Sequence, residues 1–486
     1  MPFEFIDNAS IDRTARKRIR SRAAAGRKTN KTQPRSSKTL ILKDTAATPF
    51  RDPTCLHRSE KPVAEREDPE SSFADYEIDR PIDEGLIFPV PVRAEDKYLV
   101  REALFYFSGI RHNPSLDNAL VAPDPKNTVW IRYFFLDEAY FHCSVATSIL
   151  CFRNRVVNET AVGMRHITHT YRIVRERLSG KEALSDMTIA VLVIMSQYER
   201  IQGQYARGYI HLKGLKRMAE LRGGICMLSR QCWGVVQKVL RADLEYALQL
   251  GTRTFFGADG IEALRGFDCV HIDDEGLGSG FPLDTSLQES LRGELWSIFS
   301  DMRCLAMLLH DAGVGYRQKV DGVEAHNSIL LHGFRLLQVC PLGEGSKSDF
   351  CLITGLSDLE NAVHLGLVAY LVTFLTGLDH RISDKPLLAR RLRHAIRRLS
   401  LSIEDGEQSR MVRSVLVWTL FMGSVIVFKP EEDIWLVPMT KAAMKSLDLV
   451  SWEDVRNVLA GFPWLGALHD RAGIELCSTE RLSEFA

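Results

Sequence analysis

Closely spaced cysteines are missing from this 486-residue sequence, although it contains ten cysteines in total. No two of them stand in a Cys-x-x-Cys pair, and they form no tight cluster along the chain. Zinc centres typically use such pairs, so the sequence lacks the signature of a metal site. We expect reduced, mostly buried thiols, as in proteins of the nucleus or cytosol.

Catalytic motifs are missing as well. The sequence contains no G-x-S-x-G nucleophile motif, no P-loop and no H-E-x-x-H motif. The glycine-rich segments 276–280 and 343–345 follow no predicted strand, so we interpret them as turns. Asp186, Glu199 and Glu245 are scattered carboxylates without an evident partner. We therefore predict that the protein is not an enzyme, with no catalytic residues and no cofactor.

Apolar runs long enough to cross a membrane are also missing. The longest, Ser414–Phe428 and Leu365–Leu378, are shorter than the roughly 18 to 20 residues that a span needs. We interpret both as buried helices. Residues 1–10 have no apolar signal-peptide core, so we expect no secretion signal.

The histidines do not suggest a metal site either. His166 and His169 lie three positions apart on one predicted helix face, but no third ligand stands nearby in the sequence. We interpret them as polar residues on a solvated face. The remaining histidines considered, each standing alone in the sequence, are His142, His211, His310, His364 and His469.

Alternating apolar and polar residues, the pattern of strands, are almost missing, whereas from about Asp96 apolar residues recur every three to four positions. In Glu159–Leu178 the repeating residues are Met164, Ile167, Tyr171, Val174 and Leu178. The pattern predicts an all-α domain of about a dozen stacked antiparallel helices. The predicted helices cover residues 97–110, 130–151, 159–178, 187–202, 205–221, 231–250, 288–310, 323–340, 356–378, 386–399, 410–427, 440–446, 452–460 and 464–474. We interpret Gly251–Pro282 as a long loop.

The first part of the chain has a different composition. Residues 32–93 are rich in proline, serine, threonine and charge, which cannot bury enough apolar surface to offset chain entropy. We predict that residues 1–95 are a basic arm followed by a largely disordered linker, and that residues 96–486 form the helical domain. The apolar residues Phe73, Tyr76, Ile82, Leu86, Ile87 and Phe88 interrupt the linker, and we expect this segment to dock on the domain as a strap.

One-sided charge distinguishes the segment Arg13–Lys38, which we call the basic arm. It contains eleven Lys and Arg residues and no Asp or Glu, whereas the whole chain is neutral, with 62 basic and 62 acidic residues. The rest of the chain therefore carries a net charge of −11. Such a block is typical of a nuclear localisation signal or of a phosphate-binding arm. The candidate import or phosphate-contact residues are Arg13, Arg16, Lys17, Arg18, Arg20, Arg22, Arg27 and Lys28.

Three interpretations of the basic arm remain open: an import signal, a nucleic-acid contact, and a solvated segment without a partner. The arm superficially resembles the basic region of a leucine-zipper factor, but Pro34, Pro49 and Pro53 follow where a heptad helix would be required. We therefore exclude a zipper.

A family resemblance appears in residues 185–224 and near the C-terminal end. The sequence Ser-Asp-Met-Thr-Ile-Ala-Val-Leu begins the first segment, and His-Leu-Lys-Gly-Leu-Lys-Arg-Met-Ala-Glu-Leu-Arg-Gly-Gly closes it. These segments resemble the regulatory (middle-homology) domain of fungal-specific transcription factors, over about residues 97–478. The matching positions are Asp186, Thr188, Ile189, Glu199, Gly203, His211, Gly214, Leu215, Arg222, Gly223 and Gly224, with Trp418, Trp452, Phe462, Pro463, Trp464 and His469 toward the end. The opening, Phe5 to Asn8 followed by Lys17 to Ser21, also resembles the start of many such proteins.

The resemblance implies an α-helical scaffold that serves regulation and protein interaction rather than catalysis. It also leads us to expect Glu199 and His211 to form a buried polar pair or a helix cap. One departure matters for mechanism, because family members usually carry a six-cysteine zinc cluster that reads DNA. The first 140 residues here contain one cysteine, Cys55, so that cluster cannot form.

Three functions follow as expectations. The first is a nuclear transcription regulator that acts through regulatory protein partners, with nonspecific DNA contact through the basic arm and no membrane attachment. The second is an all-α small-molecule-binding or enzymatic domain with a basic tail, since helix bundles often hold ligands between helices. The third is a structural adaptor or homodimer, which would show exposed apolar surface.

Overall fold

The computed structural model describes residues 87–93, 96–109, 113–122, 128–151, 157–270, 285–343, 355–375, 385–404 and 410–482. Residues 1–86 lie outside this part of the chain, so the predictions for the basic arm and the disordered linker lie outside the described residues. Phe88, at the end of the expected strap, is described and packs its ring on Phe134, Phe135 and Phe141 at centroid distances of 6.2, 5.5 and 5.7 Å.

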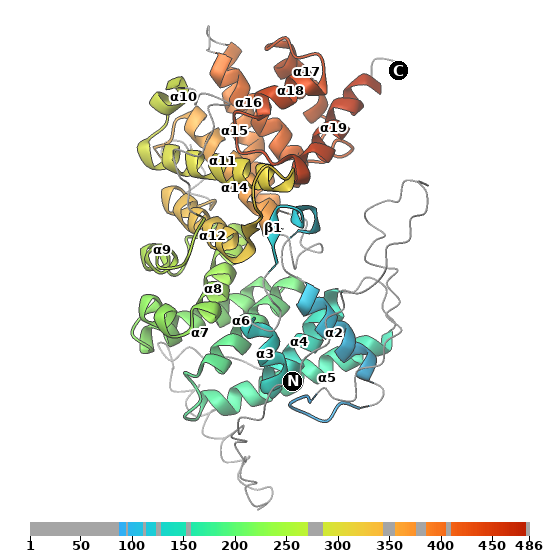
Figure 1. Cartoon of the computed structure of the whole chain (residues 1–486), viewed down its shortest axis with the longest axis vertical. Helices are drawn as coiled ribbons and strands as arrows, with labels where there is room; N and C mark the ends of the chain where they lie inside the picture. The colour runs from blue at the N-terminus through green and yellow to red at the C-terminus, as the bar shows by residue number, and fades with distance from the viewer. Residues whose placement is uncertain are drawn as a thin grey trace, which may run out of the picture. The chain divides into compact units, whose positions relative to one another are not determined.

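The prediction of an all-α protein is confirmed, since the described residues form 17 α-helices and one pair of two-residue strands (Figure 1). The first helices are α2 (Lys97–Gly109), α3 (Val129–Leu136), α4 (Glu138–Cys151), α5 (Val157–Leu178), α6 (Asp186–Ile201), α7 (Tyr205–Leu221), α8 (Ile225–Leu250) and α9 (Gly257–Arg265). The others are α10 (Thr285–Ser290), α11 (Gly293–Gly313), α12 (Gly322–Val339), α14 (Asp358–Phe374), α15 (Pro386–Glu404), α16 (Arg410–Ile426), α17 (Leu436–Lys445), α18 (Trp452–Leu459) and α19 (Gly466–Leu482). None of these helices is both long and apolar enough to span a membrane.

Local sequence signals explain many helix ends. Ser185 caps α6 by accepting a hydrogen bond from the backbone N–H of Thr188. After α7 the chain turns at Gly223 and Gly224, whose φ angles of 90° and 96° suit glycine but few other residues. Ser357 and Glu360 form a reciprocal capping box at the start of α14.

Three predicted segments differ from the structure. The helix expected over 130–151 is divided at Asp137, whose backbone is extended and whose carboxylate accepts a hydrogen bond from the N–H of Tyr140. Similarly, the helix expected over 288–310 follows a separate short helix, α10. The long loop predicted for Gly251–Pro282 is wrong in its first part, because α9 lies within it.

A buried carboxylate holds the backbone at the start of α9. Asp243 of α8 accepts hydrogen bonds from the backbone N–H groups of Phe255 and Phe256, at 2.8 and 3.1 Å. These bonds hold the chain at the entrance of α9, which the glycine and aspartate content of the segment had obscured. Burial raises the pKa of Asp243 to about 7 despite these two donors.

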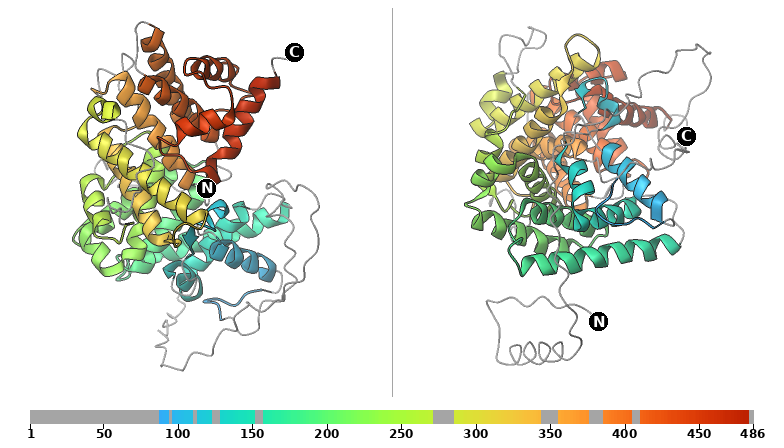
Figure 2. Two further views of the ribbon diagram at one scale, coloured as in Figure 1. Left: turned by 45° about the horizontal axis from the view of Figure 1, so that its top comes forward. Right: turned by 60° about the horizontal axis from the view of Figure 1, so that its bottom comes forward.

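Helix contacts bring distant parts of the sequence together. α4 packs against α5 and α6, α6 packs against α7 and α8, and α8 packs against α9 and α12. Near the C-terminal end, α16 packs against α14, α15 and α19, which Figure 2 shows in orange to red. Strands β1 (Leu120–Val121) and β2 (Val320–Asp321) pair in parallel, and Asp321 then caps α12. The contacts at α6, α8 and α12 position the candidate site.

Candidate functional site

The sequence-predicted site residues of the basic arm, Arg13 to Lys28, lie outside the described residues. The polar groups that the structure brings together are others, and their positions along the sequence did not indicate that they would meet. The most extensive buried arrangement among those described joins α6 to α8 and to the end of α14.

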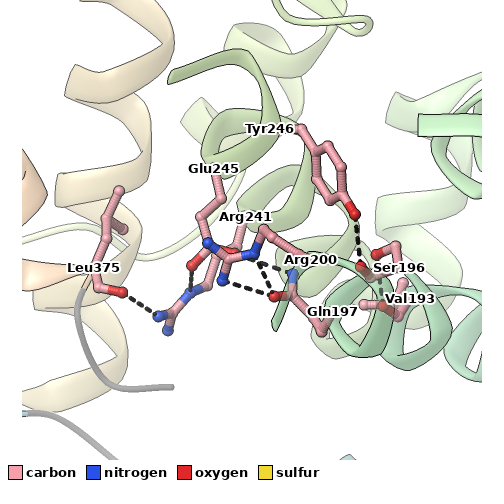
Figure 3. A network of polar contacts seen from close by, with 8 residues as sticks. All are labelled: Val193, Ser196, Gln197, Arg200, Arg241, Glu245, Tyr246 and Leu375. Carbon is pink, nitrogen blue, oxygen red and sulfur yellow. Dashed lines mark hydrogen bonds and ion pairs between the residues drawn. The ribbon is translucent and has the colours of Figure 1, made fainter. Parts of the chain in front are cut away.

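Glu245 is at the centre of this arrangement, which Figure 3 shows from close by. Its two carboxylate oxygens accept bonds from Arg200, at 3.0 Å, and from Arg241, at 2.9 Å. Gln197 donates to Glu245 at 3.0 Å and accepts from Arg200 at 2.9 and 2.7 Å. Arg241 also donates to the backbone carbonyl of Leu375 at 3.0 Å, which links α8 to the end of α14.

The network buries two positive charges beside one negative charge, which is costly. Only 3% of the side chain of Arg200, 3% of that of Glu245 and 11% of that of Arg241 is exposed. Burial alone raises the pKa of Glu245, but Arg200 and Arg241 outweigh it and hold the pKa below its ordinary value. Glu245 is therefore ionised, and two guanidinium groups share one carboxylate. The sequence interpretation of Glu245 as an unpaired carboxylate is wrong.

Two further titratable groups, Lys238 and His326, lie near this network. Lys238 lies one turn before Arg241 on α8, and His326 lies on α12 next to Asn327, which accepts a hydrogen bond from Gln237 of α8 at 2.5 Å. Burial first, and Arg241 second, lower the pKa of Lys238 to about 8 against the opposing effect of Glu245. Burial first, and then Arg241 and Lys238, lower the pKa of His326 well below its ordinary value. The three bases therefore lie within electrostatic range of one another.

A histidine cluster lies elsewhere, between α4 and α5. The Nδ1 atoms of His142 and His166 are 2.7 Å apart, and the ring of His142 stacks on His169 with centroids 5.1 Å apart. Burial lowers the pKa of His142 to about 4 and that of His166 to about 3, so both rings are neutral at physiological pH. The interpretation of His166 as a solvated residue is wrong, since it is 7% exposed, and His142 does not stand alone. Across the described ranges, no group of three or more His, Cys, Asp or Glu residues could hold a metal ion.

The residues that carry the family resemblance occupy structural positions. Asp186 at the start of α6 pairs with Arg222 at the end of α7, with 2.7 Å between Oδ1 and Nη1. Glu199 is buried as expected, but its recorded partner is the hydroxyl of Tyr171 and not His211, whose ring tilts over Tyr171 instead. The expected Glu199–His211 pair is therefore replaced by a Glu199–Tyr171 hydrogen bond.

The resemblance residues near the end of the chain form an aromatic core. Trp418 stacks on Phe462 with centroids 5.2 Å apart and donates to the carbonyl of Pro463 at 3.2 Å. His469 accepts a hydrogen bond from the N–H of Leu465 through Nδ1, and its Nε2 lies 3.2 Å from the hydroxyl of Thr373. His469, which stands alone in the sequence, therefore ties α19 to α14. His364 similarly lies 3.0 Å from the carbonyl of Leu336.

An open groove lies beside this aromatic core, between α11, α16 and the α17–α18 segment. Its volume is about 580 Å³, and its lining includes Trp296, Phe299, Met411, Arg410 and Asp448. Asp448 has a φ of 57° and is the one non-glycine residue with positive φ recorded in the described part of the chain. The groove offers an apolar floor with a charged rim, but its lining contains no nucleophile paired with a base.

Comparisons with known proteins find no significant similarity. No family model matches the sequence, and neither the curated proteins nor the solved structures contain a match.

Proposed function

We propose that this protein is a nuclear regulator of transcription that acts through its helical domain, without a DNA-reading module of its own. The observation that carries the proposal is the charge segregation, eleven basic residues and no acidic ones in Arg13–Lys38 on a chain that is otherwise acidic. The basic arm serves first as a nuclear localisation signal and second as a nonspecific contact with DNA phosphates. The helical domain binds regulatory proteins.

The domain's polar groups are consistent with a scaffold. The motif residues Asp186 and Arg222 join two helices, and Trp418 and His469 hold the aromatic core together. Such roles preserve a shape rather than perform chemistry, as expected of a regulatory domain of the fungal-specific transcription factor type. The arm supplies affinity and position on DNA, whereas sequence discrimination requires contacts to base edges.

Deletion of residues 13–38 tests the proposal. We expect the deletion to abolish nuclear accumulation of the protein while the circular dichroism and thermal unfolding of the helical domain stay unchanged. Deletion of residues 39–64 is the matched control, because it removes the same length of chain with little net charge. Unchanged nuclear accumulation after removal of 13–38 would refute the import role.

A DNA titration at several salt concentrations tests the second role. Binding that weakens steeply with salt, and that disappears with residues 13–38 but not with 39–64, is the expected result. Binding that survives the arm deletion would place the DNA contact elsewhere on the protein.

A specific observation also favours an adaptor or homodimer role. Met164, Tyr171 and Leu178 recur every seven residues along α5 and are 55%, 38% and 48% exposed, while Ile167 and Val174 of the same predicted apolar face are buried. A stripe with this period suits contact with another helix. Replacing Met164 and Leu178 together by glutamate should reduce the mass measured by light scattering if the stripe joins two copies, and an unchanged mass would exclude that dimer.

A further inference from the structure

A basic surface lies on α7 and on the segment that leads into α9. α7 carries four Lys and Arg residues and a single acidic residue, Glu220, which pairs with Arg217 at 3.1 Å. Lys213 of this helix is exposed, and Lys216 is partly exposed. Among the described residues, neither ammonium group has a recorded ion pair or hydrogen bond. Two lysines three residues apart on one helix face therefore present positive charge that no described carboxylate pairs with directly.

Two aromatic rings hold these lysines in place. The ammonium of Lys213 lies 5.2 Å from the ring centroid of Tyr209, and that of Lys216 lies 5.9 Å from the ring centroid of Phe255. The two rings contact each other, with centroids 4.9 Å apart. We call these four side chains the α7 patch. Because each cation is attracted to the face of a ring, the lysines lose less side-chain entropy on meeting an anion than freely moving ones would.

A buried carboxylate fixes the backbone beneath the α7 patch. Asp243 accepts hydrogen bonds from the backbone N–H groups of Phe255 and Phe256 at 2.8 and 3.1 Å, which anchors the ring of Phe255 beside α7. Lys216 acts electrostatically on Asp243, but that carboxylate is buried and already accepts these two bonds. The patch is therefore built on a fixed frame, which favours binding over a mobile surface cluster.

Apolar surface and acidic residues border the α7 patch. Ile210 lies three residues before Lys213 on α7 and is 46% exposed, and both aromatic rings of the patch are partly exposed. Further along the chain, α9 exposes Asp259 and Glu262, and the chain outside the basic arm has a net charge of −11. A long polyanion such as DNA would extend from the patch onto this acidic surface, whereas a short acidic segment would not.

We propose that the α7 patch and Ile210 bind a short segment of a partner protein in which acidic side chains alternate with apolar ones. Its carboxylates pair with Lys213 and Lys216, and its apolar side chains cover Tyr209, Phe255 and Ile210. This inference rests on the proposed role of the helical domain in binding regulatory proteins, and it names the chemistry of the partner. Its test measures peptide binding and not nuclear accumulation, so either proposal can fail without the other.

Fluorescence anisotropy of the full chain tests the patch with two labelled synthetic peptides. The first alternates Asp with Phe and Leu, and the second carries Ser in place of each Phe and Leu, so that both have the same charge. The basic arm attracts both peptides alike, whereas the α7 patch also contacts the apolar side chains. We therefore expect the first peptide to bind more tightly. Equal affinities, or no binding of the first peptide, would overturn the proposal.

Lys213→Gln/Lys216→Gln removes the two charges from the patch and leaves the basic arm intact. We expect it to bind the first peptide about tenfold more weakly, the combined effect of two exposed charge pairs. Lys441→Gln/Lys445→Gln is the matched control, because it removes two lysines from one face of α17 and should leave the affinity unchanged. Unchanged affinity in the first variant, or an equal loss in the control, would contradict the proposal.

Phe255→Leu tests the aromatic part of the patch. It removes the ring but keeps the backbone N–H that bonds to Asp243, so the circular dichroism of the protein should not change. We expect about fivefold weaker binding of the first peptide and unchanged binding of the second. Equal effects on the two peptides would refute the apolar contact.

A single-stranded oligothymidylate with the same charge as the peptides distinguishes a nucleic-acid surface. We expect the lysine variant Lys213→Gln/Lys216→Gln to bind it as the wild-type protein does, because the basic arm supplies the phosphate contacts. If the oligonucleotide binds as tightly as the first peptide and loses as much affinity in the variant, the α7 patch binds nucleic acid and the peptide proposal is wrong.

Discussion

Replacing Glu245 by glutamine should destabilise the protein strongly, although the two side chains have nearly the same shape. Glu245 is the carboxylate shared by Arg200 and Arg241, and all three residues are largely buried. Glutamine keeps one carbonyl acceptor, while Gln197 and the carbonyl of Leu375 still accept from the two guanidinium groups. What is lost is the negative charge to which both Arg200 and Arg241 are paired.

The magnitude follows from the energetics of buried ion pairs. Removing one partner of such a pair typically costs about 3–5 kcal/mol, because the remaining charge stays desolvated. The retained neutral acceptors place the expected cost at the lower end, about 3 kcal/mol. The pair Arg172–Glu176 has the same spacing of four residues on α5, but its side chains are 56% and 67% exposed. Glu176→Gln should therefore cost at most about 0.5 kcal/mol.

Urea unfolding followed by circular dichroism measures both changes as shifts of the transition midpoint. The double variant Arg200→Met/Glu245→Gln adds an internal control. Because Arg200 and Glu245 interact directly, the two changes together should cost less than the sum of the single ones by about 1–3 kcal/mol. The reasoning is refuted if Glu245→Gln and Glu176→Gln shift the midpoint equally. Strict additivity in the double variant would likewise show that the charges do not interact.

The remaining predictions concern protonation and close packing. Burial lowers the pKa of His364 to about 4 and that of His469 to about 3, below the 6.5 of an exposed histidine. Their contribution to the free energy of unfolding should therefore be complete above about pH 6.5 and should fall as the pH drops toward these values, because the unfolded chain then binds more protons. A urea midpoint that does not change between about pH 7 and pH 5 would contradict this. Gly366→Ala would place a methyl group 2.6 Å from the ring of Trp418 and should lower the free energy of unfolding by about 1–3 kcal/mol. Gly214→Ala, within α7, meets no atom within 4 Å outside the helix's own backbone and should instead raise it by about 0.5–1 kcal/mol. Urea unfolding distinguishes the two signs.

The bounds of a helix could be predicted from the sequence where the apolar residues followed a helical period and residues that end helices stood next to them. The predicted helix 205–221 coincides with α7, and two glycines with positive φ, Gly223 and Gly224, follow its end. The divided helix at Asp137 was missed because apolar residues continue on both sides, and a single side-chain-to-backbone bond decides the break. α9 was missed because its start depends on Asp243, twelve residues before Phe255.

The polar contacts of the candidate site could not be predicted from the sequence in this way. Glu245 looks unpaired along the chain, since Arg200 precedes it by 45 residues and belongs to another helix. Arg241, four residues before Glu245, was the available signal, but the same spacing occurs in the exposed pair Arg172–Glu176. His142 and His166 likewise meet only because α4 packs on α5.

The sequence by itself determined the all-α class and the separation of a basic arm from an acidic remainder, because both depend on composition and on residues within a few positions of one another. The tertiary structure alone decided that Glu245 pairs with both Arg200 and Arg241 and that His142 meets His166. The physical reason is that helical periodicity tells which side of a helix is apolar, whereas the meeting of polar groups depends on the axial register and crossing of helices far apart in the chain.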